Sequence, residues 1–325
     1  MNIGYANIAQ QSIRTMKRQN HTNDNICVAH LVRRNNSLDV LQTFVASYQR
    51  YESGEMHDLL IIYKGFKNEA DKAPVKSIVD KVEHLDFDVP DEGFDIDVYW
   101  LAFKSFQRKY GYFLFLNSHS EIVKSNWLKC YSEHIRQPGV GIVGATGSYQ
   151  SISSDCRYPR FLESTDRPIW SALVRKMILF LLRIIKCFWF PPYPNAHIRT
   201  NAFMLSTRVM EKITFKPMKK KTDTYRFESG KDSLTQQIVR LDLSPLVVGK
   251  DGRGYGVEEW YRSNTFWRSE QENLLIKDNQ TRAYDDGDLR QKTIYSNYAW
   301  KEKGCPNLEM LHSAEGVGIP RFKRR

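Results

Sequence analysis

The chain has 325 residues, of which 41% are hydrophobic, so it is long enough for one large α/β domain or two small ones with a buried core. Its net charge of +11 favours contact with polyanions such as nucleic acid, anionic lipid or a diphosphate-bearing substrate. The net charge is the only feature that favours a nucleic-acid partner. The sequence has no zinc-binding pattern, RNA-recognition motif or basic recognition helix, so no nucleic-acid partner is expected.

The N-terminal segment and the cysteines both bear on the compartment. Residues 1–25 are polar and lack the apolar run of a secretory signal peptide, so we expect a flexible N-terminus and no export. The five cysteines are scattered and show no CxxC spacing, which indicates reduced thiols rather than a zinc or redox centre. A cytoplasmic protein is therefore predicted.

From residue 26 onwards, apolar β-prone runs alternate with segments of helical periodicity. Strands are predicted at residues 26–32, 58–63, 112–116 and 140–144, and helices at 38–51, 73–82, 98–110 and 127–135. Because the strands are almost continuously apolar, the pattern predicts an α/β fold with a Rossmann-like, mostly parallel sheet covered by helices on both faces. Such sheets bind ligands at the carboxyl ends of their strands, so chemistry is expected in the loops after residues 32, 63 and 116.

An apolar stretch at residues 169–190 differs from the rest of the chain. Basic side chains interrupt it, so it fits poorly to a spanning helix, which needs roughly 20 uninterrupted apolar residues. Its basic residues fall near one side of a helical wheel and aromatic residues stand at its ends, which favours a membrane-interface helix within residues 168–194. A helix packed into the domain core is the competing interpretation.

The remaining segments complete the predicted domain, which spans residues 26–250. A strand followed by a helix at residues 198–213, a basic loop at 216–226, a helix at 232–240 and a strand at 245–249 are expected. Residues 251–325 lack strand alternation and are predicted to form an irregular or helical C-terminal extension. Its aromatic residues and the run 278–282 suggest a segment that covers the substrate site.

Several motifs occur in the order found in one enzyme family. The segment 116–121 reads LNSHSE and is followed by Trp127 and Leu128, a Gly-Phe turn stands at residues 93–94, and a valine- and glycine-rich strand at 140–144. Together with residues 201–213 and 228–234, this order resembles the family 2 inverting glycosyltransferases, which have the GT-A fold, and especially their bacterial rhamnosyltransferase-like members. The resemblance covers roughly residues 26–249.

The resemblance implies a hexosyltransferase-like enzyme that moves a sugar, with inversion, from a nucleotide-sugar donor to a saccharide or lipid-linked acceptor. Bacterial surface polysaccharide synthesis is the implied role, and the inner face of the cell membrane is an expected docking surface for this cytoplasmic protein. The sequence also departs from the family: His119 replaces a metal-binding aspartate, and Lys64 and Lys231 stand where acidic residues are usual. A catalytically inactive GT-A-like binding or scaffold protein is therefore the alternative.

The candidate donor site is centred on His119, which stands where the family has a metal-binding aspartate. A diphosphate leaving group needs compensating charge, from a divalent metal such as Mn²⁺ or Mg²⁺ or from cationic side chains. His119 is suited to either, as a neutral imidazole that ligates the metal or as an imidazolium that replaces it. Glu121 or Asn117 would complete an oxygen-rich site.

Inversion requires a carboxylate that takes a proton from the acceptor hydroxyl. Asp232 is the candidate general base and Glu228 the reserve, although Asp232 opens a predicted helix and capping of its backbone N–H groups is a competing role. Arg33 and Asn35 in the first loop, Asp95 and Asp97 after the Gly-Phe turn, and Arg199 on the acceptor side are predicted to contact nucleotide or phosphate.

Overall fold

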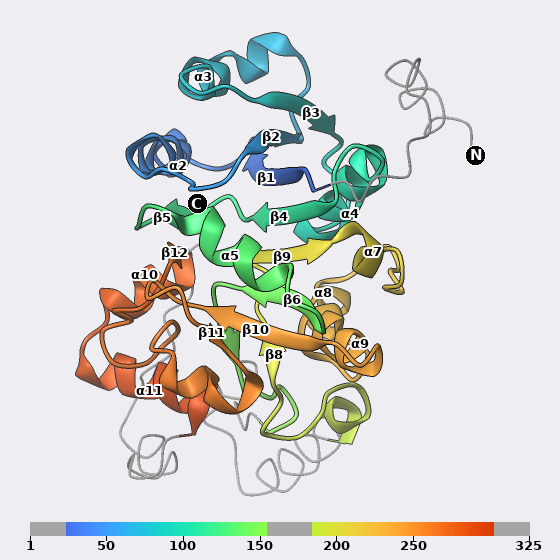
Figure 1. Cartoon of the computed structure of the whole chain (residues 1–325), viewed down its shortest axis with the longest axis vertical. Helices are drawn as coiled ribbons and strands as arrows, with labels where there is room; N and C mark the ends of the chain where they lie inside the picture. The colour runs from blue at the N-terminus through green and yellow to red at the C-terminus, as the bar shows by residue number, and fades with distance from the viewer. Residues whose placement is uncertain (1–23, 155–183, 302–325) are drawn as a thin grey trace, which may run out of the picture.

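The computed structural model describes residues 24–154 and 184–301, which form a central sheet flanked by helices (Figure 1). The strand order in the large sheet is β11-β10-β6-β9-β4-β1-β2-β3. Its strands are β1 (Ile26–Arg33), β2 (His57–Lys64), β3 (Leu85–Val89), β4 (Tyr112–Leu116), β6 (Val140–Gly144), β9 (Ala202–Ser206), β10 (Ser244–Val248) and β11 (Gly254–Tyr255). All of them are parallel except β9 and β11, so the predicted mostly parallel sheet is confirmed.

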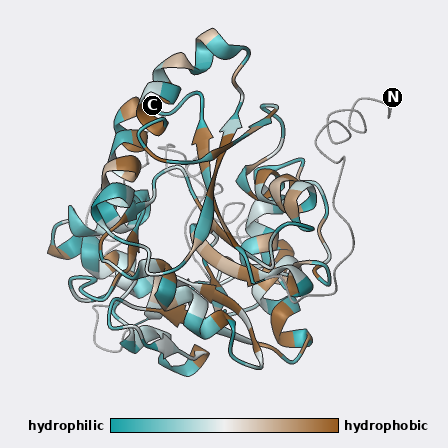
Figure 2. Cartoon of the chain, turned by 45° about the horizontal axis from the view of Figure 1, so that its top comes forward, coloured by the Kyte–Doolittle hydropathy of each residue, from teal (hydrophilic) through white to brown (hydrophobic). Residues whose placement is uncertain are grey.

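Helices cover both faces of this sheet, as predicted. One face packs against α2 (Leu38–Arg50), α3 (Glu69–Val79) and α5 (Trp127–Ile135). The other packs against α4 (Asp95–Phe106), α7 (Thr207–Met210) and α9 (Leu234–Arg240), with α8 (Lys221–Ser229) beside α9. The strands between these layers are largely apolar (Figure 2), and β1 is buried along seven of its eight residues.

The segment after residue 250 packs on the same sheet. Strand β11 pairs with β10, and β12 (Ile276–Lys277) pairs with β5 (Glu121–Ile122). A 3₁₀ helix (Val257–Arg262) and the helices α10 (Asn279–Asp285) and α11 (Leu289–Trp300) make up most of the remainder. Aromatic side chains of this segment, among them Trp260, Phe266 and Trp300, join the core on the α4 face. A second short ribbon joins β7 (Gly147–Ser148) to β8 (His197–Ile198).

Two sequence predictions are corrected. The basic segment 216–226 was expected to be a loop, but α8 begins at Lys221 because the Asp223 carboxylate accepts hydrogen bonds from the backbone N–H groups of Lys219 and Lys220. Strand β3 was not expected, because its residues are mostly exposed at the edge of the sheet and lack an apolar run.

The predicted flexible N-terminus and most of the predicted interface segment lie outside the described residues, which resume at residue 184. Within the described ranges, we find no helix with the length and apolar character needed to cross a membrane. Residues 184–189 are helical and continue into the loop that leads to β8.

Candidate functional site

The strand order makes the carboxyl ends of β1 and β4 a topological switch point, and we call the space between the loops at these ends the crevice. From β1 the chain passes through α2 to β2 on one side, whereas β4 returns to the opposite side of β1. Ligands of open α/β sheets bind at such a switch point. Because β9 is antiparallel to β4, the start of β9 lies at the same edge, and the backbone N–H of Asn117 donates to the carbonyl of Asn201 (2.8 Å).

Asn117 shapes the loop after β4. Its side-chain oxygen accepts hydrogen bonds from the backbone N–H of His119 and from the hydroxyl of Ser120, each 3.1 Å long. This local turn holds the loop over the end of the strand. Glu121 follows at once as the first residue of β5, where Lys277 is its partner.

The loop after β1 forms one wall of the crevice. Arg33 at the end of β1 pairs with Asp95, the first residue of α4, and both side chains are about one-third exposed (39% and 34%). Lys64, at the end of β2, donates to the carbonyl oxygen of Gly93 (2.6 Å). Burial, and then the charge of Arg33, lower the pKa of Lys64. Cationic and acidic groups therefore alternate along this wall.

Asp97 and Asn35, which were also predicted to contact the nucleotide, lie in different environments. Asp97 accepts backbone hydrogen bonds from Phe94 (2.7 Å) and Met218 (2.9 Å), so both of its oxygens hold the start of α4 and the segment before α8. Asn35 lies exposed in the turn after β1. Asn35 has no contact with the charged groups among the described residues, whereas Asp97 acts on Lys64 only through its charge, which opposes the lowering of the Lys64 pKa.

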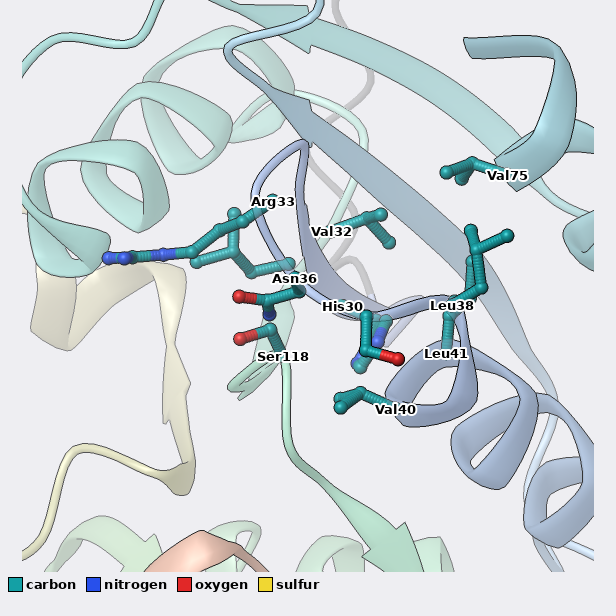
Figure 3. Close-up of a pocket in the computed structure, with 11 residues that line it drawn as sticks. His30, Val32, Arg33, Asn36, Leu38, Val40, Leu41, Val75 and Ser118 are labelled. Atoms are coloured by element: carbon teal, nitrogen blue, oxygen red, sulfur yellow. The ribbon is translucent and has the colours of Figure 1, made fainter. Parts of the chain in front are cut away.

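A small pocket opens beside β1, on the α2 side (Figure 3). Asn36 and Ser118, from the loops after β1 and β4, both line it. At its base His30 is 1% exposed and stacked on Phe44, with ring centroids 3.6 Å apart. Burial, and then repulsion from His119 when that ring is protonated, lower the pKa of His30 to about 3. The Nδ1 atom of His30 has no hydrogen-bond partner among the described residues.

The opposite wall of the crevice comes from α10. Arg282 bonds through Nε (3.2 Å) and Nη2 (2.9 Å) to Oε2 of Glu121, and through Nη1 (3.1 Å) to the carbonyl oxygen of His119. Burial, and then the charge of Arg282, lower the pKa of His119. Of the two forms considered for His119, the neutral imidazole is therefore the one favoured at neutral pH. His119 also interacts electrostatically with Arg33 and Asp278, which links the two walls.

A buried ion pair lies below this wall. The Nη2 atom of Arg199 is 3.0 Å from Oδ2 of Asp278, and the two side chains are 8% and 1% exposed. Arg199 also donates to the hydroxyl of Thr146 (3.3 Å), and its guanidinium lies 4.2 Å from the ring centroid of Phe266. Through this pair the C-terminal part of the chain is held at the strand ends.

The two candidate bases have different surroundings. An oxygen of Glu228 accepts hydrogen bonds from the backbone N–H (2.8 Å) and the hydroxyl (3.1 Å) of Thr200, the residue next to Asn201. The side chain of Asp232 is 84% exposed and pairs with Arg240 at 2.8 Å. Ser233, not Asp232, caps the helix that follows. Among the described residues, these hydrogen bonds connect Glu228 to the sheet edge.

The acidic groups at this edge do not fit a metal ion held by the protein alone. No cluster of three or more His, Cys, Asp or Glu side chains in the described ranges is placed to hold one. Two metal ligands were predicted, His119 and Glu121. The carboxylate of Glu121 is paired with Arg282, which leaves the imidazole of His119 as the other predicted ligand. Of the two further carboxylates that act on His119, Asp278 is paired with Arg199 and Asp95 with Arg33. Arginine side chains occupy the carboxylates that a cation would need.

The sequence did not single out three of the groups that line this edge. Lys64 was counted only as a departure from a motif, and neither Thr200 nor His30 belongs to a recognisable pattern. A basic residue at the end of a buried strand was the available signal for Lys64. Thr200 offered none, because its role depends on a carboxylate 28 residues away.

No protein-family model and no curated protein matches this sequence. Solved structures with a similar course of the chain include mouse xyloside xylosyltransferase 1 in its apo form (10% identity, 58% of this chain and 69% of that one, TM-score 0.34). They also include the mannosyltransferase PcManGT from Pyrobaculum calidifontis in complex with GDP-Man and Mn²⁺ (8% identity, 65% of this chain and 53% of that one, TM-score 0.37). A third is core-mannan synthase A from Aspergillus fumigatus in an Mn/GDP form (12% identity, 72% of this chain and 76% of that one, TM-score 0.36). This chain spans about half the length of the PcManGT chain.

Proposed function

We propose that this protein is a glycosyltransferase that moves a sugar, with inversion, from a nucleotide-sugar donor to a saccharide or lipid-linked acceptor. The observation that carries the proposal is the position of Glu228, which hydrogen bonds hold at the sheet edge where the crevice between β1 and β4 opens. The motif order from residue 26 to residue 249 supports the same activity, and a role in bacterial surface polysaccharide synthesis in the cytoplasm. An inactive GT-A-like scaffold is the alternative.

The donor is proposed to bind in the crevice, with its diphosphate facing Arg33 and Arg282. A guanidinium has five N–H donors. Arg282 directs three nitrogens to Glu121 and His119, and its side chain is 32% exposed, so N–H groups remain for phosphate oxygens. Fixed guanidinium groups would stabilise the negative charge that develops on the leaving diphosphate. No step of this proposal runs through a metal ion.

Glu228 is proposed as the general base. Its carboxylate takes the proton of the acceptor hydroxyl while that oxygen bonds to the anomeric carbon. The bond from the anomeric carbon to the phosphate oxygen breaks, and the nucleoside diphosphate leaves with the electron pair. The two hydrogen bonds from Thr200 orient the carboxylate and leave its other oxygen to the acceptor. Asp232, with its exposed side chain, is the reserve.

Ligand-induced thermal stabilisation tests the donor first. The protein is incubated with UDP-, GDP-, dTDP- and CMP-sugars, with Mn²⁺ or with a chelator, and the melting temperature is followed. We expect one nucleotide class to raise the melting temperature with the chelator present. If no sugar nucleotide binds and no turnover is found with any acceptor, the scaffold interpretation replaces the enzyme.

Turnover of the matched variants Glu228→Gln and Asp232→Asn tests the base. General acid–base catalysis contributes about 10²–10⁴-fold, so the Glu228→Gln variant is expected to lose that factor in kcat while donor binding is retained. The Asp232→Asn variant is expected to keep near-normal turnover. The reverse outcome would assign the base to Asp232.

A further inference from the structure

Among residues 24–154 and 184–301, exposed apolar side chains are most concentrated at residues 184–189. Ile184, Ile185, Phe188 and Trp189 are 50%, 56%, 68% and 42% exposed, and Tyr225 on α8 is 41% exposed. The other exposed large apolar side chains in the described ranges are scattered over β3, the residue before β2 and four helices, α2, α4, α9 and α11. Single exposed apolar residues are ordinary, whereas several together mark an interaction surface.

This apolar group is fixed to the body of the protein. The carbonyl oxygen of Trp189 accepts a hydrogen bond from the backbone N–H of Lys231 (2.9 Å). The guanidinium of Arg226, on α8, lies 3.2 Å from the centroid of the Trp189 ring. Phe190 is buried immediately after it. The exposed side chains are therefore presented from a packed position beside α8.

Basic residues stand at both ends of α8 and on the helix itself, beside this apolar group. Lys219, Lys220 and Lys221 stand exposed at the start of α8, and Lys231 is exposed at its other end. We call these four lysines, Arg226 and the five exposed apolar side chains the aromatic–basic surface.

We propose that the aromatic–basic surface docks the protein on an anionic lipid bilayer. Aromatic and aliphatic side chains enter the boundary between headgroups and acyl chains, while the lysines face the anionic headgroups. A nucleic-acid backbone would match the charge but would leave Ile184, Ile185 and Phe188 in water. The surface lies on the bilayer and does not cross it.

Docking on a bilayer would favour a lipid-linked acceptor over a free saccharide. This inference rests on the proposed function as a glycosyltransferase. Glu228 lies two residues after Arg226 on α8, and the carbonyl of Ser229 accepts a hydrogen bond from the side chain of Asn195 (2.7 Å). The candidate base and the docking surface thus share one helix. A lipid-linked saccharide would present its hydroxyl from the bilayer to Glu228, whereas a free saccharide would gain nothing from the docking.

Vesicle flotation tests the docking without any need for turnover. The full chain is mixed with phosphatidylcholine vesicles or with vesicles of equimolar phosphatidylcholine and phosphatidylglycerol, at low and high salt. We expect flotation with the anionic vesicles alone, weakened by salt. Phe188→Glu and the triple change Lys219→Glu, Lys220→Glu and Lys221→Glu are expected to weaken binding, the triple change by at least about 100-fold, given the attraction of each basic residue to an anionic surface.

Matched controls carry the same changes elsewhere. Leu289→Glu alters an apolar side chain that is 83% exposed on α11, and Lys67→Glu, Lys81→Glu and Lys129→Glu together reverse three exposed charges. Both controls are expected to float like the unaltered protein. Absence of flotation by the unaltered protein, or equal loss in variants and controls, overturns the docking.

The outcome for docking is separable from that for catalysis. Vesicle binding without sugar transfer would keep the docking and refute the proposed enzyme. Transfer that is equally fast in the Phe188→Glu variant and the unaltered protein, with acceptor lipid in vesicles, would keep the enzyme and overturn the inferred acceptor. A gel shift with nucleic acid lost in the lysine variant, with no vesicle binding, would assign the surface to nucleic acid.

Discussion

Replacement of Arg199 by Met is expected to lower the free energy of unfolding by about 3 kcal/mol. The change leaves the Asp278 carboxylate buried without its partner, and breaking a buried pair costs about 3–5 kcal/mol. Asp278 is 1% exposed, but it also accepts hydrogen bonds from the backbone N–H groups of Gln280 and Thr281, which favours the lower end of that range. Urea unfolding followed by circular dichroism at neutral pH measures the loss.

The pair Arg240–Asp232 provides a control of the same chemistry in solvent. Its two side chains are 55% and 84% exposed, so Arg240→Met is expected to cost about 0–1 kcal/mol. The double variant Arg199→Met with Asp278→Leu removes both charges and is expected to cost less than the two single changes together. If Arg199→Met costs no more than Arg240→Met, the buried pair does not hold the C-terminal segment as argued.

Two further changes test the interior. The lowered pKa of His30 means that protonation favours the unfolded chain, so stability is full above pH 6.5 and falls by about 1.4 kcal/mol per pH unit as the pH drops toward 3. Urea unfolding from pH 7.5 to 4.5 should show a smaller slope for the His30→Phe variant than for the unaltered protein, because other histidines with a lowered pKa, such as His119, keep their contribution; equal slopes would contradict the assignment to His30. A Cβ at Gly147 would lie 2.6 Å from the buried ring of Trp260, so Gly147→Ala is expected to cost about 1–3 kcal/mol, whereas Gly256→Ala, with open space around it, is the near-neutral control.

Two ion pairs tie the C-terminal segment to the strand ends. Arg282 reaches back across 161 positions of sequence to Glu121, and Asp278 across 79 to Arg199. Both pairs join the end of the chain to loops of the central sheet. The predicted covering role of residues 278–282 remains a proposal, and the ion pairs are its physical support.

Local pattern determined much of the fold. The apolar runs of β1, β2, β4 and β6 were recognised because strands buried on both faces carry few polar residues. The same rule failed for β3, whose polar residues face solvent at the sheet edge. It failed also for α8, which has one buried residue and depends on its cap and on packing rather than on an apolar stripe.

The sequence by itself placed candidate residues at strand ends, because parallel sheets bring those ends to one edge. It determined that Arg33, His119 and Glu121 would lie there. Only the tertiary structure decided which charged residues form ion pairs, such as Glu121 with Arg282. It also decided that Glu228, rather than Asp232, is hydrogen-bonded to the sheet edge. Periodicity reports the burial of a segment, whereas ion pairs between distant segments depend on how strands are ordered across the sheet.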